Sequence, residues 1–164
     1  MLTGTAAAAG FSPNCSAPER RQFDFWVGDW TVRDAKGKLA GTNLVTREFG
    51  GCALQEHWKG VSADRGSSFN SYLPGARLWQ QTWVDNQGLT LHLTGGLVDG
   101  SMVLRGTRIL AHGGTALDRI IWTPLRGGRV RQHWQESTDN GKNYTEIFDG
   151  YYSRRSAGLS QQSH

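Results

Sequence analysis

The sequence lacks the features that mark a helical membrane protein or the commonest enzyme classes. No apolar run approaches the roughly 20 residues that a membrane-spanning helix needs. The chain also contains no Gly-x-Ser-x-Gly nucleophile elbow, no Walker loop and no dinucleotide-binding fingerprint. We therefore expect no membrane insertion, and any function has to be sought in less specific residue patterns.

Cysteine is scarce, and the two cysteines bear on the compartment. Cys15 and Cys52 do not form a Cys-x-x-Cys pair, which argues against redox catalysis. Residues 7–9 read Ala-Ala-Ala, the small-x-small form of a signal-peptidase site, so we interpret residues 1–20 as a secretory signal remnant and arm. A merely flexible Ala-rich terminus is the alternative. Export to the periplasm or the extracellular space favours a Cys15–Cys52 disulfide over two free thiols, and closing that loop stabilises a fold by roughly 4 kcal/mol.

Concentrated positive charge and metal-ligand spacing are also missing. The formal net charge is +4, but Lys and Arg are scattered, and the pairs Arg20-Arg21 and Arg154-Arg155 lie near the ends. Nucleic-acid surfaces usually concentrate cations on one face, so we expect no nucleic-acid partner. The histidines show no ligand spacing, and we expect no metal and no cofactor. They are His57, His92, His112, His133 and His164.

Glycine, in contrast, is abundant, and the 22 glycines suit a chain that turns often. Turn signals end or begin at glycines 88, 100, 113, 127 and 141, which are 12, 13, 14 and 14 residues apart. This spacing leaves strands of about nine residues joined by short turns. We place strands near residues 24–34, 39–49, 52–61, 67–74, 77–85, 88–97, 101–110, 117–124, 129–138 and 143–153.

Ten long consecutive strands without crossover helices avoid exposed edges best by closing on themselves. We therefore predict an all-β fold, a single antiparallel up-and-down β-barrel of about ten strands over residues 21–155. A β-sandwich is the structural alternative. The arm 1–20 and the tail 156–164 have compositions typical of disorder.

Alternation along three strands places polar side chains on the same face as tryptophan. Because large aromatic residues must be buried, that face points inward. Arg119, Arg47 or Arg108 could be counter-ions for the glutamates, although strand parity does not fix their direction. The predicted interior set is Glu56, Trp58, Trp79, Gln81, Trp83, Arg119, Gln132, Trp134 and Glu136. Such a set indicates either a ligand pocket or a polar network that fixes strand register, and we favour the pocket.

The stretch Phe23–Val32 contains Gly28-x-Trp30 on the first long strand. It resembles the Gly-x-Trp opening of calycins, the superfamily of lipocalins and fatty-acid-binding proteins, in which the Trp plugs one end of the barrel. In lipocalins an Arg late in the chain packs over that Trp, and Arg154 or Arg155 could correspond to it. The haem-binding nitrobindins carry a histidine near the end of the chain, but residues 144–152 contain none, which argues against haem.

The pattern of the whole chain is similar to that of an uncharacterised family of exported bacterial proteins, a domain of unknown function with a calycin-like barrel. The resemblance implies a fold and a compartment over residues 20–153, but no substrate or catalytic set. The matching segments are Phe23–Val32, Gly51-Cys52 with Glu56 and Trp58, Trp79–Asp85, Val130–Trp134 and Phe148–Tyr151.

Three functions remain open at this point. The first is a secreted protein that binds a small molecule in a Trp-lined, partly polar cavity. The second is an acid–base enzyme, an isomerase, cyclase or hydrolase, with Glu56 or Glu136 as its catalytic carboxyl. The third is a structural or interaction protein whose barrel is filled by its own side chains. The oligomeric state is not predictable from these residues.

Overall fold

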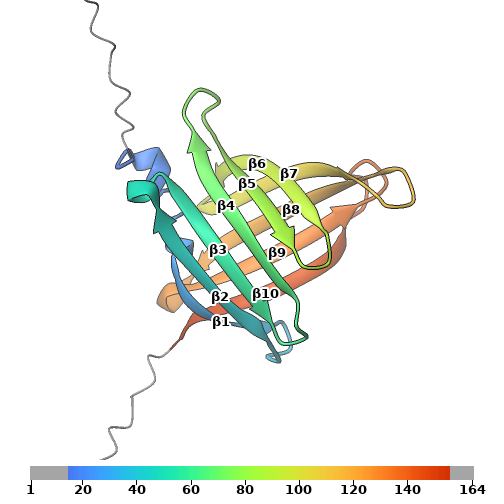
Figure 1. Cartoon of the computed structure of the whole chain (residues 1–164), viewed down its shortest axis with the longest axis horizontal. Helices are drawn as coiled ribbons and strands as arrows, with labels where there is room; N and C mark the ends of the chain where they lie inside the picture. Colours follow the sequence, from blue (N-terminus) through green and yellow to red (C-terminus); the bar gives the residue numbers. More distant parts are fainter. Residues whose placement is uncertain (1–14, 156–164) are drawn as a thin grey trace, which may run out of the picture.

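The structure is a computed structural model that describes residues 15–155. Each of its ten strands pairs antiparallel with the next along the chain, and β1 lies beside β10, which closes the barrel (Figure 1). The strands are β1 (Gly28–Asp34), β2 (Leu39–Glu48), β3 (Ala53–Gly60), β4 (Arg65–Leu73), β5 (Leu78–Asp85), β6 (Thr90–Val98), β7 (Ser101–Ile109), β8 (Thr115–Leu125), β9 (Arg129–Ser137) and β10 (Thr145–Arg154). The prediction of an all-β, up-and-down barrel is confirmed, and the sandwich alternative is excluded.

The short helices lie at or before one end of the barrel. Two 3-10 helices, η1 (Pro18–Arg21) and η2 (Asp24–Trp26), precede β1, so the predicted first strand starts four residues later than expected. Two more, η3 (Phe49–Gly51) and η4 (Arg126–Gly128), form the β2–β3 and β8–β9 turns. This end, which also carries the β4–β5 and β6–β7 turns, is called the closed end below.

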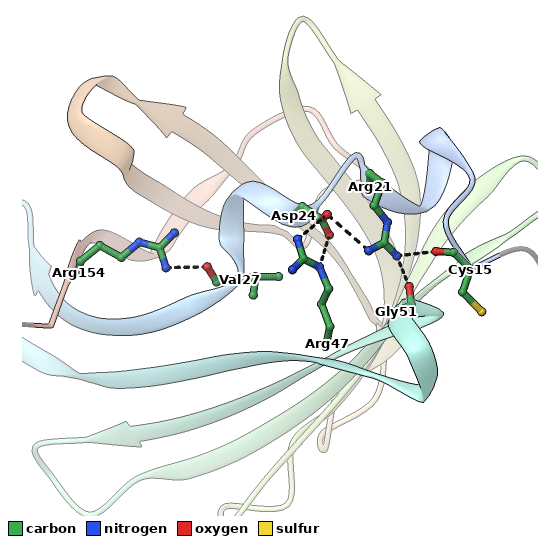
Figure 2. Close-up of polar contacts among 7 residues, drawn as sticks. All are labelled: Cys15, Arg21, Asp24, Val27, Arg47, Gly51 and Arg154. Carbon is green, nitrogen blue, oxygen red and sulfur yellow. Dashed lines mark hydrogen bonds and ion pairs between the residues drawn. The ribbon is translucent and has the colours of Figure 1, made fainter. Parts of the chain in front are cut away.

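Residues 15–20 belong to the folded unit, so the expectation of disorder was wrong for them. Cys15 and Cys52 form the predicted disulfide, which ties the arm to the start of β3. Arg21 Nη2 donates to the carbonyl oxygens of Cys15 (2.7 Å) and Gly51 (Figure 2). Composition could not reveal these tertiary anchors. The proposed signal remnant up to residue 14 and the tail 156–164 lie outside the described residues.

An aromatic cluster plugs the closed end. Phe23 stacks on Trp26 with ring centroids 4.9 Å apart and meets Trp79 and Trp122 edge-on at 5.6 and 5.2 Å. All four side chains are buried. Buried aromatic residues contribute large apolar areas, so this cluster supplies much of the hydrophobic core at the closed end.

Trp30 lies in the same end, covered by an arginine from the last strand. The Arg154 guanidinium lies 4.0 Å from the Trp30 ring centre, and its Nη1 donates to the Val27 carbonyl oxygen at 2.7 Å (Figure 2). Gly28 has a backbone φ of +155°, which residues with a side chain rarely adopt, and a Cβ there would also displace the Arg154 guanidinium. Of the two arginines considered from sequence, Arg154 is the one that packs over Trp30.

Candidate functional site

A cavity of about 360 Å³ lies inside the barrel and reaches the end opposite the aromatic cluster, here called the open end. Six of the nine predicted interior residues line it: Glu56, Trp58, Gln81, Trp83, Gln132 and Trp134. The floor includes Trp122, which also contacts the aromatic cluster at the closed end. Asp64 and Gln87 of the β3–β4 and β5–β6 turns form part of the mouth, together with Arg65 at the start of β4.

The prediction was wrong for Arg119, which lies outside the barrel. Its neighbours in sequence, Asp118 and Ile120, are buried, and alternation therefore turns Arg119 outward. There its Nη2 donates to Gln135 Oε1 at 2.7 Å, and its guanidinium lies 4.0 Å from the Tyr144 ring centre. The sequence alone had left the direction of Arg119 open, and the buried residues on either side of it decide the face.

Trp79 and Glu136 point inward as predicted but do not line the cavity. Trp79 lies in the closed-end cluster and donates its indole N–H to Gln22 Oε1 at 3.2 Å. Glu136 forms an ion pair with Arg108, whose Nε also donates to Asp118 Oδ2 at 2.8 Å. The alternation of residues along a strand shows whether a side chain points inward or outward. How far along the barrel axis it lies depends on the register between neighbouring strands.

Of the arginines considered as counter-ions, Arg108 therefore pairs with Glu136, whereas Arg47 pairs with neither glutamate. Arg47 Nη2 lies 2.7 Å from Asp24 Oδ2 at the closed end (Figure 2).

Three inward-facing glycines make room for aromatic rings around the mouth. A Cβ at each of these positions would overlap the ring that lies over it. Each ring therefore packs directly on the backbone of its glycine. The pairs are Trp58 over Gly41, Trp83 over Gly66 and Phe148 over Gly150. Packing the rings against the wall in this way keeps the centre of the barrel open.

The Glu56 carboxylate lies at the centre of a buried hydrogen-bond network. Its Oε1 accepts from Asn43 Nδ2 at 2.7 Å, and its Oε2 accepts from Ser68 Oγ at 2.7 Å. Ser68 Oγ in turn accepts from Asn70 Nδ2 at 2.9 Å, and Asn70 Oδ1 accepts from Gln81 Nε2 at 2.8 Å. The donors in this chain run toward Glu56, the arrangement that suits an ionised carboxylate.

The network continues on the other side of Glu56 toward the cavity wall. Asn43 Nδ2 also lies 3.4 Å from the Tyr152 hydroxyl oxygen, and the Tyr152 hydroxyl donates to Gln132 Oε1. Glu56, Gln132 and Tyr152 all line the cavity, so a bound molecule would meet a connected set of polar groups. A substitution at one member should therefore alter the others.

Burial raises the pKa of Glu56 from 4.5 to about 7, while the hydrogen bonds from Ser68 and Asn43 act in the opposite direction. Only 4% of the Glu56 surface is exposed, and no Lys, Arg or His in residues 15–155 forms an ion pair with it. Burial, followed by the nearby charge of Glu56, raises the pKa of Tyr152. Glu56 is thus a buried carboxyl that can gain or lose a proton near neutral pH.

Sequence reasoning missed several members of the site, mainly Asn43, Ser68, Asn70 and Tyr152. Their strands carry no tryptophan, and the other aromatic residues of β4 and β10 alternate onto both faces, so the aromatic rule that found Glu56 could not mark the inner face there. A weaker signal was available: Asn43 lies two residues before the apolar Val45 and therefore shares its face, which the structure shows to be buried.

Comparison of the sequence with protein-family models and with curated proteins found no match. Among residues 15–155, no three His, Cys, Asp or Glu side chains gather closely enough to hold a metal ion. The same part of the chain contains no helix with the length and hydropathy needed to cross a membrane. Function therefore has to be inferred from the cavity itself.

Proposed function

We propose that this protein binds a small organic molecule inside its barrel. The observation that carries the proposal is the cavity of about 360 Å³, in which aromatic walls surround a few convergent polar groups. Small-molecule sites in proteins typically have volumes of roughly 300–1,000 Å³ and this combination of lining residues. A barrel filled by its own side chains would leave no such space, so the cavity favours binding over a purely structural role.

The lining residues divide into two roles in this proposal. Trp58, Trp83 and Trp134 offer ring surface against which a flat or apolar body packs. Gln81, Gln132 and Glu56 offer hydrogen-bonding groups that orient it. Because the open end is ringed by turns, a ligand would enter there and stop at the Trp122 floor.

The proposal is tested by titrating intrinsic Trp fluorescence, and thermal unfolding in parallel, against a panel of metabolites. Gln132→Ala removes a polar group from the cavity and should weaken binding of any hit, whereas Gln135→Ala on the outer face of the same strand should not. Equal affinity of wild-type protein, Gln132→Ala and Glu56→Ala for every hit would show that binding occurs elsewhere.

The second candidate function is acid–base catalysis by Glu56. It is favoured by one observation, a pKa of about 7 for a carboxyl that lines a cavity, since catalytic acids and bases are tuned in this way. Glu136 does not share the cavity, so a two-carboxyl mechanism is not part of this candidate. If a compound from the panel is converted, Glu56→Gln should abolish turnover while retaining the fold. Unchanged turnover in that variant would exclude the mechanism.

The proposed location is the periplasm or the extracellular space. The Cys15–Cys52 disulfide supports it, because such bonds persist in oxidising compartments. Alkylation of the protein in intact native cells, followed by mass spectrometry, should find both cysteines protected until a reductant is added. Alkylated cysteines without reductant would contradict export.

A further inference from the structure

The charge of the cavity is opposite in sign to the charge of the protein. The chain carries a formal net charge of +4, yet the charged residues lining the cavity are Glu56, Asp64, Asp85 and a single cation, Arg65. With all of them ionised, three carboxylates face one guanidinium. Arg65 Nη1 is already engaged with the carbonyl oxygens of Gly60 and Asp64, at 2.8 and 2.7 Å.

Three of the four tryptophans that line the cavity have their indole N–H groups occupied by aspartates, whereas Trp122 Nε1 at the floor has no hydrogen-bond partner among the described residues. Trp58 Nε1 donates to Asp64 Oδ2 at 2.7 Å, and Trp83 Nε1 lies 3.4 Å from Asp85 Oδ2. Trp134 Nε1 donates in the same way to Asp118 Oδ1 at 2.8 Å.

These three indoles therefore have no N–H left to donate to an anionic or carbonyl group of a ligand. What they offer is ring surface, and the negative face of an aromatic ring attracts cations.

Glu56 completes the pattern because its carboxylate accepts hydrogen bonds but has no counter-ion. Each of its oxygens receives one hydrogen bond, from Asn43 and from Ser68, and the described residues supply no ion pair to it. A buried carboxylate without a partner cation is costly. A cationic ligand would supply the counter-ion that the protein does not.

We propose that the ligand is a small organic cation, a protonated or quaternary amine on an aromatic or apolar body. Its cationic group binds among the rings of Trp58, Trp83 and Trp134 with Glu56 as counter-ion. This inference rests on the proposed function, because it assigns a ligand class to the same cavity.

Three probes that share a phenyl ring and a two-carbon linker separate charge from shape: 2-phenylethylamine, 2-phenylethanol and 3-phenylpropanoate. Their dissociation constants are measured by isothermal titration calorimetry at neutral pH with the wild-type protein. The amine should bind at least about tenfold more tightly than the alcohol, and the carboxylate more weakly than either. This comparison needs no variant, so it holds even where a cavity substitution disturbs folding.

Two variants then test whether the preference for the amine over the alcohol depends on Glu56. Glu56→Gln should reduce the advantage of the amine over the alcohol to about threefold or less. Glu48→Gln removes the same charge at the closed end, away from the cavity, and should keep the full advantage. Equal effects of the two variants would overturn the assignment of Glu56.

The outcomes separate this inference from the proposed function. If the alcohol or the carboxylate binds as tightly as the amine, the cavity binds small molecules but the ligand class is wrong. If none of the three binds at millimolar concentration, the cation inference is overturned. The proposed function then depends on the metabolite panel and its Gln132→Ala variant.

Discussion

Replacing Glu56 by Gln should change how the stability of this protein depends on pH. The pKa of Glu56 is about 7 in the folded protein and near 4.5 in an unfolded chain, mainly because burial disfavours the charged form. Between these two values the folded state holds a proton that the unfolded state has released. The free energy of unfolding therefore falls as pH rises through this window, and is greatest, as far as Glu56 is concerned, below pH about 4.5.

The size of this effect follows from the pKa difference. A rise from 4.5 to about 7 corresponds to about 3 kcal/mol of unfolding free energy, lost between pH about 4 and pH about 8. Glutamine cannot ionise, so Glu56→Gln lacks this contribution. Any loss of hydrogen bonding with Asn43 or Ser68 in the variant shifts its stability by an amount that does not depend on pH.

Urea unfolding followed by circular dichroism, repeated at several pH values, measures the difference directly. The wild-type minus Glu56→Gln stability should fall by about 3 kcal/mol from pH about 4 to pH about 8. Glu48→Gln is the charge-matched control and should keep the wild-type fall, since Glu56 is intact in it. Parallel pH curves for wild type and Glu56→Gln would refute the account of a desolvated carboxyl.

Three further changes test other parts of the structure. Gly66→Val should destabilise the fold by about 1–3 kcal/mol in urea unfolding, because the new side chain collides with the Trp83 ring; an unchanged midpoint would contradict the ring position. Arg154→Ala should cost about 1–3 kcal/mol by removing the guanidinium that covers Trp30, and a neutral result would show that this contact is dispensable. Reducing the disulfide, whose cysteines are 37 residues apart, should lower stability by about 2–4 kcal/mol and therefore the melting temperature, whereas an unaltered melting temperature would mean that the arm is held by other contacts.

The fold was predictable because barrel topology leaves a regular trace in this sequence. Evenly spaced glycine turns define the hairpins, and β6 shows the alternation typical of a strand, with Leu91 and Leu93 buried and Thr90 and His92 exposed. The N-terminal arm was not predictable in the same way. Its order depends on the disulfide and on arginine contacts with distant backbone carbonyls, which leave no local pattern.

The site was predictable only where tryptophan marked the inner face. Glu56 and Gln132 were predicted correctly because each shares a face with a tryptophan on its strand, and both line the cavity with Trp58, Trp83 and Trp134. The depth of each residue in the barrel depends on how neighbouring strands are staggered, which no single strand reveals. Glu136 and Trp79 were misplaced for this reason.

The hydrogen-bond network around Glu56 was invisible from the sequence for a related cause. It joins side chains from β2, β3, β4, β5, β9 and β10, so it exists only once the barrel has closed. Residues such as Asn70 and Tyr152 look like ordinary strand residues until their partners are known.

The most direct test of small-molecule binding is an NMR titration of the seven tryptophan indole N–H signals. Four of the tryptophans line the cavity: Trp58, Trp83, Trp122 and Trp134. At least one of 2-phenylethylamine, 2-phenylethanol and 3-phenylpropanoate should shift these four saturably, with much smaller changes at Trp26, Trp30 and Trp79. If a compound that binds the protein leaves the four cavity signals unshifted, or moves all seven alike, the barrel does not hold small molecules in the way proposed.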